Sequence, residues 1–272
     1  MRKKKVLIVT QEMQPYTAAT TISEIARQLP QYVQEHGMEI RVLMPRFGSI
    51  NERRHRLHEV VRLSGMNIIV DDDDYPLVIK VASLPEGRMQ VYFLDNEDFF
   101  RRKHVFVDDQ GQPFDDNAER MVFFCKGVIE TVRKFGWPPD IIHCHGWMTS
   151  LVPLFLKTAY RNEPLFQQAK IVYSLYDEPL GNNPEDSFLS KALVSNLSAE
   201  DLRAYQNGTG IKLQKGAVMY ADAVVQGSQE VEGGLLDLIT GMEKPFLPYP
   251  GADKLAPIFE FYQTLLPEKV SE

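Results

Sequence analysis

The sequence is poor in cysteine and has no long apolar runs. Only Cys125 and Cys144 occur among 272 residues, which is too few for a disulfide framework and fits a reducing compartment. No apolar run is long enough to cross a bilayer. The basic start at residues 3–5 lacks the apolar stretch and the small-residue cleavage site of a signal peptide. These absences predict a cytoplasmic protein without a membrane partner.

Positive charge is scarce as well. The chain has 30 Lys and Arg against 37 Asp and Glu, which gives a formal net charge of -7. Proteins whose main partner is a nucleic acid or an anionic membrane surface usually present a basic face. We therefore expect no nucleic-acid partner.

The common cofactor and metal motifs are also missing. The sequence has no Gly-x-Gly-x-x-Gly, Walker A or Gly-x-Ser-x-Gly segment. The acidic run at residues 71–74 does not have the spacing of an EF-hand loop and is expected to form a solvated hairpin turn. His143 and His145 point to one face of a strand and Cys144 to the other, so the three cannot bind one metal ion without distortion. We predict neither a cofactor nor a metal site.

What the sequence does contain is an alternation of short apolar strands and amphipathic helices. Strands are expected at residues 6–9, 40–44, 141–142, 171–175 and 223–225. Helices are expected from Thr21, whose spacing to Glu24 matches a capping box, and over residues 116–134, 151–160, 211–220 and 230–239. Pro30 is expected to kink or split the first helix. This rhythm predicts an α/β, Rossmann-like, doubly wound and mostly parallel sheet.

Two stretches interrupt that rhythm. Residues 60–63, 66–70, 77–82 and 89–94 are predicted to be strands of an inserted β-hairpin region. Residues 178–210 are rich in Asn, Pro, Ser and Gly, which indicates a long surface excursion with a short helix near 188–194.

The amino-acid composition changes again after Gly241, so we divide the chain into a domain over residues 1–241 and a tail over residues 242–272. The tail is rich in proline and has one apolar helical segment, at residues 258–266. We expect this helix to pack on the domain, either as a docking helix or merely as cover for a sheet edge, because otherwise it would expose an apolar patch. A second copy of the chain is an alternative target.

The densest group of polar residues is the segment His143-Cys144-His145-Gly146-Trp147, which ends the strand at 141–142. Open α/β sheets bind ligands at the carboxyl ends of their strands. A helix expected from about Thr149 could also turn its amino terminus toward an anion. The histidines can equally be satisfied residues of the strand end, and both interpretations stay open. Cys144 as a nucleophile beside His145 is a weaker alternative.

The same segment, continued to Pro153, resembles the His-x-His-Asp-Trp-His-x-x-Leu-x-Pro segment of bacterial glycogen synthases and plant starch synthases. Three further stretches agree in the same order: Glu-x-x-Pro at residues 12–15, Arg-Val-x-x-Pro-x-Phe at 41–47 and Tyr-Ala-Asp at 220–222. The resemblance covers residues 5–230. It implies one half of a GT-B glycosyltransferase fold, the amino-terminal or acceptor-side half, and an activity that transfers glucose from a nucleotide sugar such as ADP-glucose to an α-1,4-glucan.

The resemblance also implies site residues. His145 matches the histidine expected near the transferred glucosyl group and is the catalytic candidate. The remaining substrate cleft is expected where parallel strands end. Its predicted residues are Thr17, Thr20, Trp147, Tyr176 and Asp177.

Several residues depart from the family pattern. Its Lys-x-Gly-Gly-Leu motif falls on residues 18–22, where the lysine is Ala18 and the two glycines are Thr20 and Thr21. β-branched side chains resist the backbone conformations that glycine allows. The family's aspartate is Gly146 and its second histidine is Met148. Arg46 is only a weak candidate for the missing cation.

We therefore expect a relative with an eroded donor site, and we expect the family's second domain to be absent. Two hypotheses remain. The chain is a glucosyltransferase, or one half of one, completed by a separate chain, with a glucan or a nucleotide sugar as its ligand. Alternatively it is a non-catalytic module that binds a glycan, a partner protein or a second copy of itself. In either case the protein alone is not expected to transfer glucose.

Overall fold

A computed structural model describes residues 2–84, 89–178, 197–207, 210–231 and 233–267. Its centre is one large sheet with the strand order β12-β11-β8-β7-β1-β2-β6-β5-β3, and β4 pairs with β5. Strands β12 through β6 in this order run parallel, and β3, β4 and β5 are antiparallel to their neighbours. The mostly parallel α/β sheet with an inserted hairpin region is confirmed.

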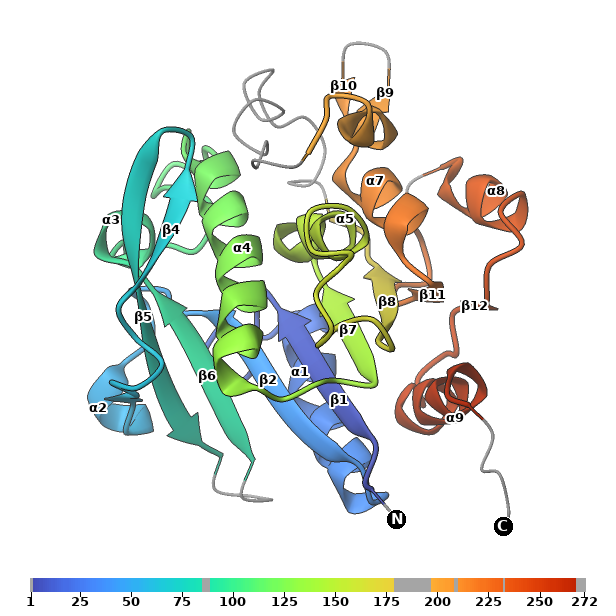
Figure 1. Ribbon diagram of the computed structural model, residues 1–272, viewed down its shortest axis with the longest axis horizontal. Coiled ribbons are helices and arrows are strands. Elements are labelled where there is room, and N and C mark those ends of the chain that lie inside the picture. The colour runs from blue at the N-terminus through green and yellow to red at the C-terminus, as the bar shows by residue number, and fades with distance from the viewer. Residues whose placement is uncertain (1, 85–88, 179–196, 208–209, 232, 268–272) are drawn as a thin grey trace.

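The parallel part of the sheet is built from buried apolar strands. These are β1 (Lys5–Thr10), β2 (Glu39–Pro45), β6 (Gln90–Asp95), β7 (Ile141–His145), β8 (Lys170–Leu175), β11 (Ala223–Gln226) and β12 (Phe246–Leu247). Helices α4 (Asn117–Phe135), α5 (Leu151–Lys157) and α7 (Leu213–Tyr220) cover one face, and α1 (Thr21–Glu35) covers the other (Figure 1). Burial on both faces explains why these strands are continuously apolar.

The remaining elements are short. They are α2 (Glu52–His55), β3 (His58–Glu59), β4 (Met66–Val70), β5 (Asp73–Ser83), α3 (Glu97–Phe100), β9 (Gln206–Asn207), β10 (Gly210–Ile211), α8 (Leu235–Thr240) and α9 (Leu255–Leu265). Among the described residues no helix is both long and apolar enough to span a membrane.

The inserted region differs from its prediction at two points. Residues 61–63 form a turn, so the strand predicted over 60–63 is wrong, and β3 has only two residues. The Ser64 hydroxyl bonds the Val60 carbonyl at 3.2 Å and accepts from the Ile79 amide at 3.0 Å. A side chain that bonds the local backbone in this way offers it an alternative to a ladder. Asp71, at φ 57°, and Asp72 form the hairpin turn between β4 and β5, whereas Asp73 and Asp74 already belong to β5, which begins before the predicted residue 77.

Helix α1 begins where it was predicted, but its cap lies one residue earlier. Thr20 is the N-cap: its side chain accepts from the Ser23 amide at 3.0 Å, and the Ser23 hydroxyl accepts from the Thr20 amide at 2.8 Å. The predicted box from Thr21 to Glu24 is therefore wrong. The helix also runs unbroken through Pro30, which is buried with Leu29 and Val33, so Pro30 does not split it. Burial of this apolar face stabilises the helix against the loss of one backbone hydrogen bond.

Other boundaries shift as well. The helix predicted from residue 230 begins at Leu235, after Gly234 in the left-handed region at φ 86°. The helix predicted to reach residue 160 ends at Lys157. The short helix predicted near 188–194 lies outside the described residues.

The tail lies on the rest of the chain. Strand β12 pairs in parallel with β11, and helix α9 packs on α1, where the Phe259 ring lies 5.9 Å from Tyr32 and 5.0 Å from His36. Tyr262 is fully buried, and its hydroxyl lies 2.5 Å from His143 Nδ1 in β7. Residues 242–267 are thus packed on the domain, as expected. The division of the chain at residue 241 stays a prediction.

We expect Tyr262→Phe to lower the free energy of unfolding by about 1–3 kcal/mol, because it leaves a buried nitrogen of His143 without its partner. Urea denaturation of the purified variant measures this loss. Phe261→Leu, a change of a half-buried ring on the same helix, is the control for packing. A loss for Tyr262→Phe no larger than experimental error would show that α9 is not held through His143.

Candidate functional site

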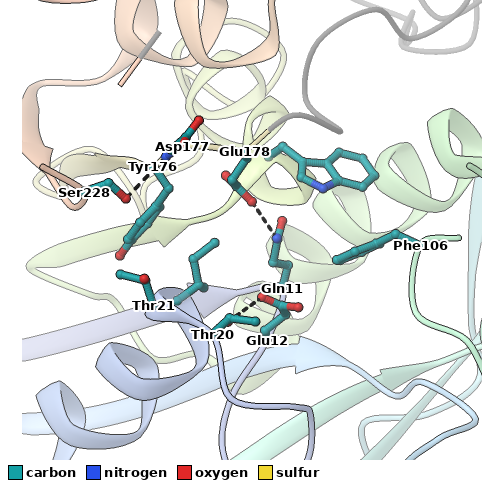
Figure 2. A pocket seen from close by; sticks show the side chains of 11 residues that line it. Gln11, Glu12, Thr20, Thr21, Phe106, Tyr176, Asp177, Glu178 and Ser228 are labelled. Carbon is teal, nitrogen blue, oxygen red and sulfur yellow. Dashed lines mark hydrogen bonds between the residues drawn. The ribbon is translucent and has the colours of Figure 1, made fainter. Parts of the chain in front are cut away.

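A pocket of about 270 Å³ opens where four neighbouring parallel strands end (Figure 2). Residues that follow β1, β7, β8 and β11 line it, together with the first turn of α1 and one residue from the loop before α4. The lining residues are Gln11, Glu12, Thr20, Thr21, Ile22, Phe106, Trp147, Tyr176, Asp177, Glu178 and Ser228. The carboxyl ends of parallel strands are where open α/β sheets bind ligands.

Gln11 connects two walls of the pocket. Its Nε2 donates to Glu178 Oε1 at 2.7 Å, and its Oε1 accepts from the Met148 amide at 3.0 Å. The side chain lies against Gly146, which has φ 88°; a Cβ at Gly146 would come within 2.2 Å of Gln11 Cδ. Glycine suits this position, because the backbone conformation is strained for other residues and a side chain here would displace Gln11.

Glu12 lies on the side of the pocket formed by α1. The Thr20 hydroxyl donates to Glu12 Oε2 at 2.9 Å, so the residue that caps α1 also holds this carboxyl (Figure 2). Burial raises the pKa of Glu12 above its ordinary value. Thr20 has an extended backbone with φ -138°, as a β-branched residue prefers.

Glu178 faces Glu12 from the other side. Burial raises the pKa of the Glu178 carboxyl to about 8, and the negative charges of Glu12 and Asp177 add to this effect. Its Oε2 is buried and has no hydrogen-bond partner in the part of the chain that the structure describes. The neighbouring Asp177 is exposed. The pocket therefore carries a carboxyl group that stays protonated at neutral pH.

His145 lies behind Tyr176, outside the pocket lining. It is fully buried, and its Nδ1 lies 2.7 Å from the Tyr176 hydroxyl. Burial lowers the pKa of His145 to about 3 and that of His143 well below its ordinary value, so both rings are neutral. The rings lie 3.9 Å apart, and His143 bonds Ser174 and Tyr262. As predicted, the two histidines share one face of β7.

Residues 5–243 match the sequence profile described as the starch synthase catalytic domain. The chain belongs to this family.

Relatives in the starch synthase family carry the name glycogen synthase. The chain is 37% identical to that of Chlorobaculum tepidum over 248 residues, which is 89% of this chain and 50% of the relative. It is 41% identical to that of Chlorobium luteolum over 177 residues, which is 65% of this chain and 36% of the relative. The chain thus spans about half the length, or less, of the curated relatives it matches.

A solved structure agrees with the fold. The catalytic domain of starch synthase IV from Arabidopsis thaliana, bound to ADP and acarbose, superposes with a TM-score of 0.75 at 21% identity. The match covers 91% of this chain and 51% of that one. The expected fold, half of the GT-B architecture of the starch synthase family, is confirmed.

The structure brings four of the residues predicted from the starch synthase resemblance into one pocket: Thr20, Trp147, Tyr176 and Asp177. The other two do not line it. His145 is fully buried with its Nδ1 2.7 Å from the Tyr176 hydroxyl, and the Thr17 hydroxyl accepts from the Met13 amide at 3.1 Å. Their roles, like those of the other four, stay predictions.

Sequence reasoning missed several lining residues, among them Gln11, Phe106 and Glu178. Gln11 directly follows β1 and Glu178 lies three residues after β8, so the strand-end rule used for Tyr176 points to both. Phe106 comes from a loop that has no sequence signal. Its ring lies 5.1 Å from that of Trp147.

Arg46 does not supply the cation that the starch synthase motif lost. Its Nε lies 2.9 Å from Asp95 Oδ2 and 3.3 Å from Glu52 Oε1, and it does not line the pocket. Within the described ranges, no group of three or more His, Cys, Asp or Glu has the geometry to hold a metal ion. Burial raises the pKa of Cys144 well above its ordinary value, which argues against a nucleophilic thiolate.

Proposed function

We propose that the pocket binds a sugar ring of an α-glucan and does not hold the diphosphate of a nucleotide sugar. Aromatic faces and hydrogen-bonding carboxyl groups are combined in one small cavity, a combination suited to a ring with apolar faces and hydroxyl edges. A volume of about 270 Å³ is at the lower end of small-molecule sites. The site thus suits one sugar unit better than a whole nucleotide sugar.

The charge of the lining carries this proposal. It contains Glu12, Asp177 and Glu178 but no Lys, Arg or His among its described residues. A diphosphate needs cations or backbone amides close to its oxygens. The family's lysine position is Ala18, and Thr20 and Thr21 occupy its two glycine positions. Carboxylates within a few ångström of a diphosphate repel it, so nucleotide-sugar binding is disfavoured.

The same features bear on the family's reaction. His145, the catalytic candidate, is separated from the cavity by Tyr176, whose ring packs so closely on Gly227 that a Cβ there would lie 2.4 Å from it. Transfer of glucose would require Tyr176 to move and a cation to reach the leaving group. We propose that this chain is a glucan-binding relative of the synthases that does not transfer glucose by itself.

Binding and activity assays on the purified chain test this proposal. We expect maltotriose to bind, ADP-glucose to bind at least tenfold more weakly, and no labelled glucose to enter glycogen. Thr21 is exposed at the pocket rim, so Thr21→Trp should block the pocket and weaken maltotriose binding at least tenfold. Gln28→Trp, at an exposed position two turns further along α1, is the matched control.

Two results would contradict the proposal. ADP-glucose binding more tightly than maltotriose would show that the donor site is intact. Equal maltotriose affinities for Thr21→Trp and Gln28→Trp would place glucan binding elsewhere on the chain.

A further inference from the structure

We propose that the pocket prefers a sugar carrying a protonated amine to the neutral sugar of the same shape, with Glu12 and Glu178 contacting the ammonium group. This inference rests on the proposed function, because it concerns the same cavity. It goes beyond that function by naming the chemical class of the preferred ligand, an amino sugar.

The two carboxyl groups come from different strands and are held by different partners. Glu12 follows β1 and is bonded by Thr20, whereas Glu178 follows β8 and is bonded by Gln11. In Figure 2 they lie on opposite sides of Gln11, with Tyr176 and Phe106 at the two flanks. The charge of Glu12 raises the pKa of Glu178, so the two carboxyl groups are close enough to act on one bound cation.

Glu12 and Glu178 each have one carboxyl oxygen that accepts a hydrogen bond, but the second oxygen of Glu178 has no donor among the described residues. Its Oε1 accepts from Gln11 at 2.7 Å, while its Oε2 is buried and has no hydrogen-bond partner within the described ranges. A buried acceptor without a donor is costly. An ammonium group has three donors and no acceptor, so it can take the place of the proton on Glu178, which is released to solvent, and donate to this oxygen without leaving a new group unpaired.

The described lining of the pocket supplies no counterion for its acidic groups. No Lys, Arg or His occurs among the described lining residues, and no cation contributes to the pKa of Glu12 or Glu178. Burial is the main cause of both raised values, and the charge of Glu12 adds to that of Glu178. A positively charged ligand offsets the negative charge of ionised carboxyl groups, whereas a neutral sugar only offers them hydrogen bonds.

The aromatic lining supports the same ligand. Phe106, Trp147 and Tyr176 surround the cavity with ring faces that stack on sugars and attract cations. Trp147 is 4% exposed, and its indole Nε1 has no partner in the described structure. That donor is available to a ligand hydroxyl beside the amine.

The test compares methyl α-D-glucopyranoside with its 2-amino-2-deoxy and 6-amino-6-deoxy analogues by calorimetry, near pH 6.5 in a buffer without amines. At least one amine is expected to bind about tenfold more tightly than the neutral glucoside. Salt at about 0.5 M should reduce this preference only partly, because a buried charge pair is screened less than an exposed one.

Substitutions of the two glutamates test whether these residues produce the preference for the amine. Glu12→Gln and Glu178→Gln should each reduce the ratio of amine to neutral affinity severalfold. Glu260→Gln removes an exposed carboxylate on α9 and should leave the ratio as it is.

The possible results distinguish a failure of the amine preference from a failure of the proposed glucan binding. If the neutral glucoside binds as tightly as both amines, the inference is overturned and the glucan site stands. If none of the three sugars binds, and maltotriose does not bind either, both fail. An amine preference that survives in the Glu12→Gln/Glu178→Gln double variant also overturns the inference.

Discussion

Glu178→Gln is expected to stabilise the protein by about 3 kcal/mol near pH 8 and to change its stability little near pH 5. The pKa of Glu178 is raised to about 8 from an ordinary value of 4.5. Between these values the folded protein keeps a proton that the unfolded chain releases. The contribution of this group to stability is therefore present below pH 4.5 and is lost as the pH rises toward 8. Glutamine does not ionise and still offers Gln11 an acceptor oxygen.

Urea denaturation at the two pH values measures this effect. Glu260→Gln, which removes an exposed carboxylate, is the matched control and is expected to change stability little at either pH. A gain for Glu178→Gln of the same size at pH 5 and pH 8 would contradict the prediction, because it would trace to packing rather than to ionisation.

The same variant is expected to lose part of the amine preference while it gains stability. Both effects are expected of a residue that lowers the stability of the fold but strengthens ligand binding. Binding sites often keep buried charge that the fold alone would not favour. A Glu178 with a purely structural role would show the stability change without a change in the affinity ratio.

The main sheet could be predicted from the sequence because its strands are short, apolar and separated by amphipathic helices. Val6 to Val9 and Ile171 to Leu175 are buried on both faces and read as continuous apolar runs. The acidic hairpin turn was also predictable, because charged residues between two apolar runs have no place in a core.

Local hydrogen bonds explain the two wrong predictions of secondary structure, the strand at residues 60–63 and the cap of α1. The Ser64 hydroxyl bonds the backbone of residues 60 and 79 and favours a turn where apolar residues suggested a strand. Thr20 caps α1 instead of Thr21 because its own hydroxyl is engaged by both the Ser23 amide and Glu12. Several arrangements of these short polar side chains fit the sequence, and long-range contacts decide among them.

Only those site residues that lie at the ends of parallel strands could be predicted from the sequence. Thr20, Trp147 and Tyr176 meet because parallel strands end at one edge of the sheet. His145 is fully buried and bonds the hydroxyl of Tyr176, a contact that no spacing along the chain reveals. The raised pKa of Glu178 likewise depends on its burial and on the charge of Glu12, 166 residues earlier in the chain.

Gly146→Asp, which restores the aspartate of the family pattern, is expected to destabilise the protein by about 4 kcal/mol. Two causes combine. The backbone at φ 88° and ψ 158° is strained for any residue with a side chain, at about 1–3 kcal/mol. The new Cβ would also lie 2.2 Å from Gln11 Cδ, so Gln11 must leave its contacts with Met148 and Glu178, at about 1–3 kcal/mol.

Gly37→Asp separates these causes. Gly37 has φ 90°, but a Cβ there meets nothing within 4 Å, so this variant reports the backbone strain alone. Urea denaturation of both variants should show a clearly larger loss for Gly146→Asp. Gln11→Ala introduced beside Gly146→Asp should then cost less than the sum of the two single changes, because Gln11 has already been displaced. Equal losses for Gly146→Asp and Gly37→Asp would show that Gln11 moves aside freely. In that case the family's aspartate could be restored beside this pocket while Gln11 keeps its contacts with Met148 and Glu178. The site would then differ from that of its relatives only in which residues it contains, and not in its backbone.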